Sequence, residues 1–347
     1  MQTLDILLRP LAALYGAVAS VRARLYARHW LETRRLARPV VSVGNLTLGG
    51  TGKTPFVAAL ARHLCDAGLR PAIVSRGYGR RSRGVVVVSD GFSVKVDRDQ
   101  AGDEPWMLAR ELPGVAVVVG ESRFEAGQVA EEMLGADVHL LDDGFQHLSL
   151  ARTLDIVLLD AGAEPSSLRV VPAGRLREPL AALGRAHMVV LTRTHHGHPL
   201  DPLRSLVSTH APGVPVYAAS QRAIGWRGLD GAVKPVGSLS GKAALVLAGI
   251  GAPAQFLRDL DELGVERRGQ LLYRDHHRYT AADIKRIKDE RRRVGAEVVV
   301  VTTMKDQVRL DGLDLGDLAI NALMIEAVLP EDASFLRLVD AAVGRSS

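Results

Sequence analysis

The segment GGTGKT at residues 49–54 constrains this chain more than any other feature. It follows an apolar run at 40–43 and precedes a helix-like stretch at 56–65, so the local order is strand, loop, helix. The backbone N–H groups of such a loop, with the amino end of its helix, form a cradle for phosphate groups. In that cradle Lys53 reaches the β- and γ-phosphates of a nucleotide, and the Thr54 hydroxyl binds Mg²⁺.

The loop departs from the spacing G-x-x-x-x-G-K-T, because Thr47 stands where the first glycine should be. The additional glycines Gly49 and Gly50 indicate a variant loop. A glycine-rich turn with a chance lysine is the alternative. The flanking strand and helix favour the variant loop, because the phosphate-binding motif requires both.

Length and charge limit the possible classes of protein. The 347 residues allow two domains with separate cores, and the single Cys65 excludes a disulfide framework, which fits a reducing compartment. Residues 1–38 carry seven Arg against Asp5 and Glu32, an excess equal to the net charge of +5 of the whole chain. The remainder is balanced, which argues against a general nucleic-acid surface and for a local anionic partner.

The N-terminal segment has the pattern of an amphipathic helix with Pro10 in its first turn. Its uncharged run at 10–21 is too short to span a bilayer. One interpretation is a helix on an anionic membrane face, with an apolar stripe of Leu11, Leu14, Tyr15, Val18, Val21 and Leu25. The other is a helix docked on its own domain through the small residues Ala12, Gly16, Ala19, Ala23 and Ala27. The two interpretations use different faces, so both stay open.

Beyond residue 38, strand and helix signals alternate. Apolar, β-branched runs lie at 40–43, 72–75, 85–88, 115–119, 138–141, 156–159, 188–191, 244–248, 297–302 and 322–327. Helical patterns lie at 56–66, 104–111, 122–134, 253–263 and 280–294. The alternation predicts an α/β fold with mostly parallel sheets, and so many strands predict two domains.

We expect four segments along the chain. An amphipathic, membrane-associated helix occupies 1–38, and a P-loop NTPase-like domain occupies 39–220. A linker follows at 221–241, where glycine and proline are dense, and a smaller α/β domain occupies 242–347.

Two acidic positions are candidates for the site. Asp142 and Asp143 follow the apolar run at 138–141, where a P-loop fold holds Mg²⁺ through a second group; an acidic turn is the alternative. Asp103 stands just before a helix and by itself suits an N-cap. As a catalytic base it would need a partner that holds and tunes it.

Arginines and one histidine add further candidates. Four Arg within 75–83 suit an anionic substrate, or simply a solvated loop. Arg177 suits either an arginine finger or a surface ion pair. His276 precedes a capping-box-like helix start at 280–283, where a structural histidine is the more common finding.

Taken together, the clusters resemble the tetraacyldisaccharide 4′-kinases, the lipid A 4′-kinase family. The matching segments occur in the family's order and cover about residues 40–310. They are GNLTLGGTGKTP at 44–55, SRGYGR at 75–80, GDEP at 102–105, DDGFQH at 142–147, LREP at 176–179, AGIG at 248–251 and DHHRY at 275–279.

The resemblance implies ATP-dependent phosphorylation of the 4′-hydroxyl of a tetraacyldisaccharide 1-phosphate, which forms lipid IVA in lipid A biosynthesis, with Mg²⁺. It also implies peripheral attachment to the cytoplasmic face of a Gram-negative inner membrane through the N-terminal helix. No nucleic-acid partner is expected, and a monomer is the default.

The resemblance also assigns residues. The ATP-binding loop is Leu48, Gly49, Gly50, Thr51, Gly52, Lys53, Thr54 and Pro55. Thr54, Asp142 and Asp143 match metal positions, and Asp103, His276, Lys53 and Arg177 match catalytic ones. Tyr78, Arg80, Glu104, Gln146, His147 and Glu178 match substrate-binding or supporting positions. Met304 departs from the family, which has a glutamate there, so a carboxylate role at that position is in doubt.

This assignment makes chemical sense, because a sugar hydroxyl attacks well only when a base takes its proton. A histidine behind Asp103 would orient the carboxylate and share the charge of the proton. Since Asp103 and His276 fall in different expected domains, we expect domain closure to assemble the base.

Two other classes of protein also use variant loops. A metallochaperone-type GTPase requires an Asn-Lys-x-Asp segment, but Lys305 and Asp306 are adjacent and no Asn precedes them. A membrane-bound positioning ATPase has a signature lysine where this chain has Leu48, and its anchor helix is usually C-terminal. Both are therefore weaker interpretations than the kinase.

Overall fold

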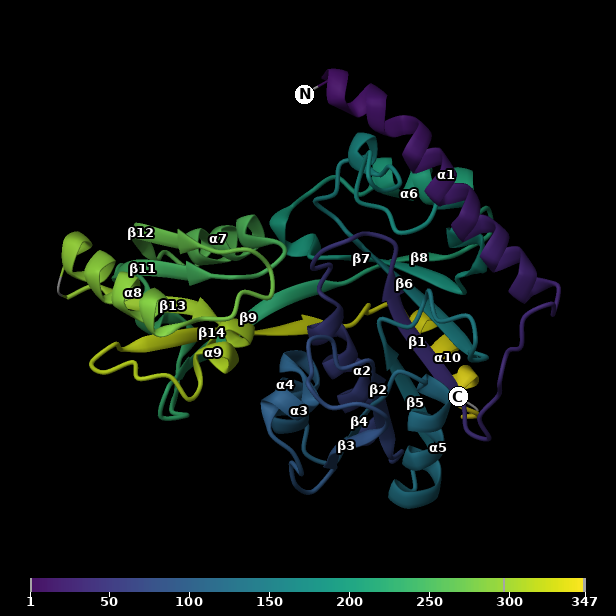
Figure 1. The fold of residues 1–347 in the computed structure, drawn as a ribbon, viewed down its shortest axis with the longest axis horizontal. Helices are drawn as coiled ribbons and strands as arrows, with labels where there is room; N and C mark the ends of the chain where they lie inside the picture. Colours follow the sequence, from purple (N-terminus) through teal and green to yellow (C-terminus); the bar gives the residue numbers. More distant parts are fainter. Residues whose placement is uncertain (1, 296, 346–347) are drawn as a thin grey trace. The chain divides into compact units, whose positions relative to one another are not determined.

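The computed structural model describes residues 2–295 and 297–345. Contacts divide the chain into two units: the first joins Met1–Gln221 with Ala327–Ser347, and the second is Arg222–Glu326. Each unit has α/β architecture with its own sheet (Figure 1). The predicted mostly parallel α/β class is therefore confirmed.

The sheet of the first unit has the order β3-β4-β2-β5-β1-β6-β7-β8. Its strands are β1 (Val40–Asn45), β2 (Pro71–Ser75), β3 (Val86–Asp90), β4 (Ala116–Val119), β5 (Val138–Asp142), β6 (Leu154–Asp160), β7 (Met188–Thr192) and β8 (Val216–Ala218). Neighbouring strands are parallel, except that β3 pairs antiparallel with β4. The central strands are buried along their length, because helices cover both faces of a parallel sheet.

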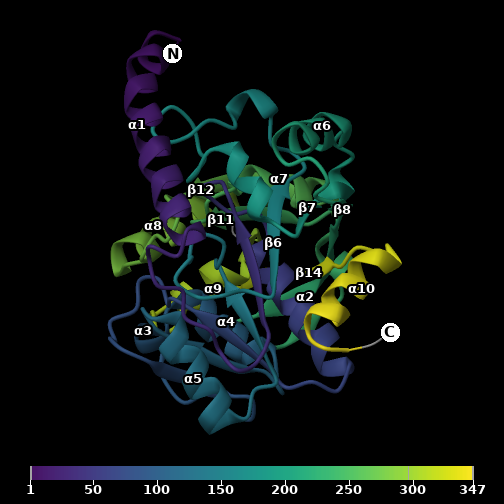
Figure 2. The same ribbon diagram turned by 90° about the vertical axis from the view of Figure 1, so that its right-hand side faces the viewer.

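Alternate strand residues supply two cores on opposite faces of this sheet. Ile73 packs in the core that includes α2 (Lys53–Asp66), α4 (Asp103–Glu111) and α10 (Ala333–Ala342). Its neighbour Val74 packs in a core that includes α5 (Arg123–Leu134). Farther along that face, η2 (Leu180–Arg185) and α6 (Asp201–His210) form a third core. Figure 2 shows α10 beside α2, where Phe335 meets Phe56 edge to face. Shorter elements are α3 (Arg98–Ala101), η1 (Pro165–Ser167) and η3 (Thr194–His196).

Strand order reverses at β1, which lies between β5 and β6. From β1 the chain passes through α2 to the β2 side of the sheet, and from β6 it extends the opposite side. Ligands of open α/β sheets bind at the carboxyl ends of strands at such a point. Val43 is in register with Asp142, so the glycine-rich loop and the Asp142–Asp143 pair leave the sheet at the same edge.

Helix α1 (Gln2–Ala27) docks on the first unit through its small residues. Ala12 and Gly16 are buried, and a Cβ at Gly16 would lie 3.3 Å from Cγ of Pro179. On the opposite face Leu14 and Val18 are 63% and 61% exposed. Pro10 lies inside the helix and not in its first turn. Among the described residues, no helix combines the length and the apolar content needed to cross a membrane.

The sheet of the second unit has the order β10-β9-β14-β13-β11-β12. Its strands are β9 (Ser220–Gly228), β10 (Val233–Lys234), β11 (Ala243–Ala248), β12 (Glu266–Leu272), β13 (Val299–Thr303) and β14 (Ile320–Val328). Helix α7 (Pro253–Glu262) packs in one core, while α8 (Ala281–Val294) and α9 (Met304–Leu310) pack in another. The predicted capping box of α8 is present, with Thr280 and Asp283 bonding each other's backbone N–H. A single turn, η4 (Val236–Leu239), precedes β11.

Two expected boundaries differ from the structure. The segment 221–241 is not a linker, because β9, β10 and η4 lie there and Trp226, fully buried, donates to the Val236 carbonyl at 2.8 Å. Its glycines serve a hairpin, with Gly231 at a φ of 82°. Residues 327–345 return to the first unit, because Phe335 is fully buried there against Phe56 and Tyr217.

Candidate functional site

The glycine-rich loop turns at Gly52, which has a φ of 78° and directly precedes α2. A Cβ at Gly52 would lie 2.6 Å from Nε2 of Gln221, so a larger residue would also collide there. The loop is held from the carboxyl end of β7, where the Thr192 hydroxyl donates to the Thr51 carbonyl at 2.9 Å and Arg193 donates to the Gly50 carbonyl at 2.8 Å. Sequence analysis did not find these two supports, because they come from β7, far along the chain.

Lys53 and Arg177 flank Asp143. Nζ of Lys53 lies 3.4 Å from Oδ1 of Asp143 and 3.0 Å from Oδ1 of Asn45. The guanidinium of Arg177 donates to Oδ2 of Asp143 at 2.7 Å. Burial would raise the pKa of Asp143, but Lys53 and Arg177 outweigh burial, so this pKa lies below its usual value. The structure thus brings three predicted site residues into one contact group.

Two further hydroxyl–carboxylate pairs lie at the loop and at the end of β5. The Thr54 hydroxyl donates to Glu104 at 3.4 Å, and the Ser75 hydroxyl donates to the buried Asp142 at 3.5 Å. Oxygen atoms of this kind are the ligands that Mg²⁺ prefers. The Thr51 hydroxyl is buried and makes no hydrogen bond within the described residues, which fits a loop built to receive phosphate oxygens. The residues present therefore fit a magnesium–nucleotide site.

Asp103 is the first residue of α4 and not its N-cap. The N-cap position belongs to Gly102, which has a φ of 90°. The Asp103 side chain is half-buried, and Glu104 beside it reaches Thr54. The capping alternative is therefore removed, and the contact of Glu104 with Thr54 places the GDEP segment beside the loop.

The arginine loop at 75–83 does not present four free cations. Arg80 is committed to Glu121 at 2.7 Å and to the Gly84 carbonyl at 2.7 Å, and Arg81 pairs with Asp99 at 3.0 Å. Tyr78 is 71% exposed. Arg80 therefore holds this loop in place, which suits the supporting one of the two roles expected for it.

Arg123 is a candidate that sequence analysis missed. It is 5% exposed at the first position of α5, and burial, only partly offset by Asp142 and Asp143, lowers its pKa to about 10. A cation in the first turn of a helix opposes the helix dipole. An arginine at this unfavourable position is the sequence signal that could have identified Arg123.

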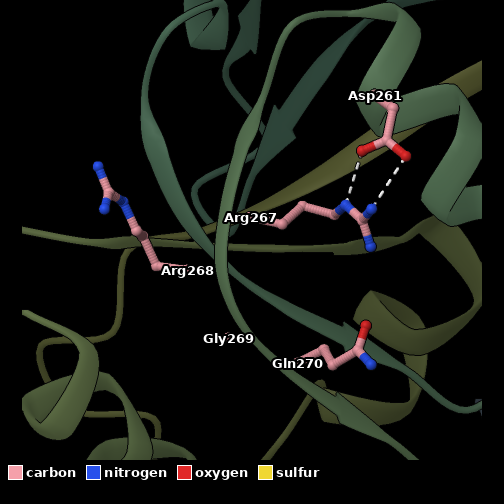
Figure 3. A pocket seen from close by; sticks show the side chains of 5 residues that line it. All are labelled: Asp261, Arg267, Arg268, Gly269 and Gln270. Carbon is pink, nitrogen blue, oxygen red and sulfur yellow. Dashed lines mark hydrogen bonds and ion pairs between the residues drawn. The ribbon is translucent and has the colours of Figure 1, made fainter.

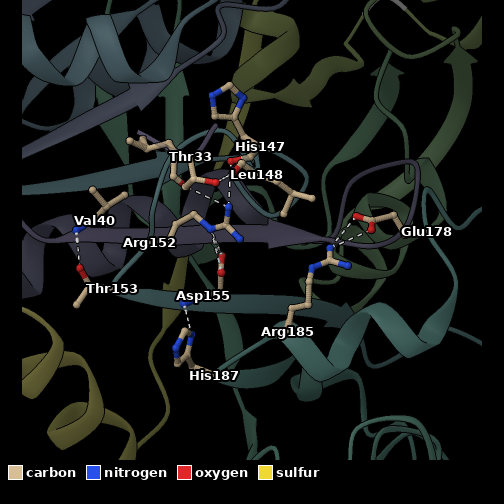
Figure 4. Close-up of polar contacts among 11 residues, drawn as sticks. Thr33, Val40, His147, Leu148, Arg152, Thr153, Asp155, Glu178, Arg185 and His187 are labelled. Carbon is tan, nitrogen blue, oxygen red and sulfur yellow. Dashed lines mark hydrogen bonds and ion pairs between the residues drawn. The ribbon is translucent and has the colours of Figure 1, made fainter. Parts of the chain in front are cut away.

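Gln146 and His147 follow Asp143 in a tightly held loop. The Gln146 side chain donates to the Asn45 carbonyl at 3.1 Å, and Arg22 of α1 donates to the Gln146 carbonyl at 3.2 Å. Arg152 donates to the His147 carbonyl at 3.0 Å while it pairs with Asp155 (Figure 4). Helix α1 therefore contacts a loop of the candidate site.

In the second unit, His276 has a φ of 58°, and its Nδ1 lies 3.2 Å from the guanidinium of Arg309. A positive φ is rare outside glycine, and strained residues of this kind concentrate at functional sites. Asp306 is fully buried and accepts from Gly249 N–H, from the Tyr279 hydroxyl and from the Thr303 hydroxyl. Asp306 thus ties the AGIG and DHHRY segments together. Asp103 belongs to the first unit and His276 to the second.

A pocket on β12 is a poor anion site. It is lined by Asp261, Arg267, Arg268, Gly269 and Gln270 (Figure 3). Arg267 makes two bonds to Asp261, and Arg268 pairs with Glu266. Both cations already have carboxylate partners, so the pocket lacks free positive charge.

The fold and the loop together define a nucleotide-binding enzyme of the P-loop class. The model of the tetraacyldisaccharide-1-P 4′-kinase family (LpxK) matches residues 4–344. The chain belongs to this family, and it is therefore an enzyme of the kinase class.

Individual relatives agree with the family model. The chain is 45% identical to the tetraacyldisaccharide 4′-kinase of Pelobacter propionicus, over 88% of this chain and 83% of the relative. It is 42% identical to that of Anaeromyxobacter dehalogenans, over 94% and 85%. A crystal structure of LpxK from Aquifex aeolicus in complex with ATP is 32% identical, with a TM-score of 0.78 over 98% of this chain and 99% of that chain.

Proposed function

We propose that this chain transfers the γ-phosphoryl group of ATP to the 4′-hydroxyl of a tetraacyldisaccharide 1-phosphate, the step of lipid A biosynthesis that forms lipid IVA. Family membership supports the class of substrate. The observation that carries the proposal is the contact group at the loop, where Lys53 and Arg177 flank Asp143. Two cations beside a phosphate cradle suit a reaction in which charge neutralisation is the main requirement.

Residues 48–55 form the ATP site in this proposal. Lys53 exchanges its contacts with Asn45 and Asp143 for phosphate oxygens when ATP binds. Thr54, Asp142 and Asp143 would hold Mg²⁺, which neutralises charge on the phosphate oxygens. Arg177, one hydrogen bond from Asp143, stabilises the phosphoryl group in transfer.

The base in the proposal is Asp103, with His276 as its partner. A half-buried carboxylate at the start of α4, beside Glu104 and the loop, suits removal of a proton from a sugar hydroxyl. The resemblance to the family supplies the role of His276 in this proposal, since a histidine partner orients such a carboxylate and shares the charge of the proton. Tyr78, Gln146 and His147 surround the acceptor sugar, and Glu104 supports Thr54.

We also infer peripheral attachment to the inner membrane through α1. Its apolar face is exposed, whereas its small-residue face is occupied by the first unit. Residues 1–38 carry the basic excess of the chain, which suits an anionic lipid surface. This attachment places a lipid-borne hydroxyl within reach of the loop that Arg22 contacts.

The test is a transfer assay with γ-labelled ATP and the tetraacyldisaccharide 1-phosphate in mixed micelles. The proposal predicts one new phosphate ester at the 4′-position, located by mass spectrometry and NMR, and ATP preferred over GTP. ATP hydrolysis without a phosphorylated lipid, or a preference for GTP, would contradict the proposal.

A further inference from the structure

Arg185, at the end of η2, bridges two segments of the candidate site. Its guanidinium donates to both carboxylate oxygens of Glu178, at 3.0 and 2.9 Å (Figure 4). The same guanidinium lies over the ring of Phe145, 4.7 Å from its centroid. Glu178 belongs to the LREP segment and Phe145 to the DDGFQH segment. Sequence analysis did not single out Arg185.

Phe145 is a fixed platform for this bridge. Its side chain is fully buried, and a Cβ on Gly44 would lie 2.5 Å from the Phe145 Cβ, so β1 and Phe145 are in direct contact. A planar guanidinium that stacks on a fixed ring has little freedom. Its Nη2 group, which donates to both oxygens of Glu178, therefore sets the place of that carboxylate. Phe145 is fixed against β1, and Arg185 contacts both Phe145 and Glu178. The position of β1 therefore determines the position of the Glu178 carboxylate.

Glu178 is adjacent to Arg177, which contacts Asp143 at 2.7 Å. From its other side, the same segment is tied to the end of β1, because Arg177 N–H donates at 2.6 Å to the carbonyl of Leu46, the residue that follows this strand. Glu178 is 6% exposed, and both of its oxygens accept from Arg185. A buried carboxylate with this geometry is suited to hold the backbone at Arg177 and not to receive a substrate.

We propose that Arg185 is a positioning residue for phosphoryl transfer, which acts through Glu178 by fixing Arg177 beside Asp143. This inference rests on the proposed function. Of the two roles expected for Glu178, substrate binding or support, it favours support. A displacement of about 1 Å at a reacting group lowers the rate on the order of 10²-fold, so the loss of this bridge is measurable.

The primary variants are Arg185→Gln and Glu178→Gln, measured in the transfer assay with the full chain. Each is expected to lower kcat on the order of 10-fold to 10²-fold, with KM for ATP within about twofold. Arg267→Gln is the control, because Arg267 on the exposed β12 also donates two hydrogen bonds to one carboxylate, that of Asp261, through Nε and Nη2. It should retain the wild-type kcat. A kcat within about twofold of wild type for Arg185→Gln overturns the proposal, as does a loss confined to KM.

Arg185→Lys keeps the charge but loses the planar guanidinium that stacks on Phe145. It is expected to restore part of the lost kcat, and it carries the test if Arg185→Gln does not fold by its thermal transition. The decisive comparison uses an Arg177→Ala background. In that background, Arg185→Gln should lower kcat by less than about threefold, because the Arg177 side chain that Arg185 positions is already absent. A loss as large as in the wild-type background overturns the proposal. If wild type and Arg267→Gln transfer no phosphate at all, the proposed function fails, and not only the role of Arg185.

Discussion

At the scale of single residues, the contact group at the glycine-rich loop is centred on the carboxylate of Asp143. Two cations contact it, and they keep its pKa low in spite of burial. Its φ of 58° adds backbone strain of a kind that costs about 1–3 kcal/mol and concentrates at functional sites. The carboxylate therefore has a defined position, and its cationic partners are already placed for a phosphate.

His147 gives a residue-scale prediction about pH. Burial, and then the charges of Arg123 and Arg152, lower its pKa from 6.5 to about 4. The unfolded chain thus binds this proton near pH 6.5 and the folded chain only near pH 4, so acid favours unfolding. The contribution of neutral His147 to the free energy of unfolding should be fully present above pH 6.5, and it should be lost as the pH falls toward 4.

The measurement is the free energy of unfolding of wild type and of His147→Gln between pH 4 and 8, with an imidazole NMR titration. The variant should lose part of this pH dependence. An imidazole that titrates near 6.5 in the folded protein would refute the prediction.

At the scale of elements, α1 has two faces with different tasks. Gly16 packs near Pro179, which directly follows Glu178, while the apolar stripe stays exposed. The two sequence interpretations of this segment are therefore compatible, since docking uses the small residues and leaves the other face available. The docked face is established by the structure, and membrane contact is the proposal.

For α1, we predict that replacing both Leu14 and Val18 by Asp weakens sedimentation with anionic vesicles. Each side chain would otherwise bury apolar area worth about 1.5–3 kcal/mol. ATP binding should be unchanged. Phe92→Asp is the control, because Phe92 is 96% exposed outside α1. Equal sedimentation of the double variant and the control would show that α1 is only structural.

Helix α10 supplies a second element-scale prediction. Phe335 is fully buried, with its ring centroid 5.4 Å from that of Tyr217. Phe335→Ala should lower the free energy of unfolding of the first unit by about 3–5 kcal/mol, measured by chemical denaturation. Leu338→Ala, on the same helix but 39% exposed, should cost much less. Equal losses would mean that the C-terminal helix does not complete this core.

At the scale of the whole molecule, the two units carry different parts of the proposed chemistry. The loop, Asp103 and Arg177 belong to the first unit, and His276 belongs to the second. The proposed dyad therefore predicts coupling between residues of different units. The free energy of this coupling can be measured from kcat of the single and double variants.

Asp103→Ala and His276→Ala should each lower kcat on the order of 10²–10⁴-fold while ATP binding survives. The double variant should be little worse than the stronger single variant, because members of one catalytic unit are not additive. If the two losses of kcat multiply in the double variant, Asp103 and His276 act independently. An unchanged kcat in either single variant would remove the dyad.

Much of this fold could be predicted from local pattern. The apolar run at 40–43, the glycines and the following helical period correctly gave β1, the loop and α2, because all three signals lie within one segment. Strand β12 was missed, since at the sheet edge its residues Glu266, Arg267 and Arg268 are exposed and charged. The glycines at 221–241 led to the prediction of a linker, whereas β9, β10 and η4 occupy this segment.

The candidate site was only partly predictable. Lys53, Asp143 and Arg177 were each found from their own motifs, and the structure adds that they touch. Arg185 was not found, because its role depends on a ring and a carboxylate brought to it by folding. The contact of Arg80 with Glu121 could not be predicted, because the two residues are distant in sequence.

The central claim is that Lys53 and its loop hold the ATP phosphate that is transferred to the lipid. The most direct test compares γ-phosphoryl transfer by wild type, Lys53→Met and Lys95→Met. Lys95 is the control, because it pairs with Asp90 on an exposed turn. We predict a loss on the order of 10²–10³-fold for Lys53→Met and wild-type transfer for Lys95→Met. Wild-type transfer by Lys53→Met would contradict the account.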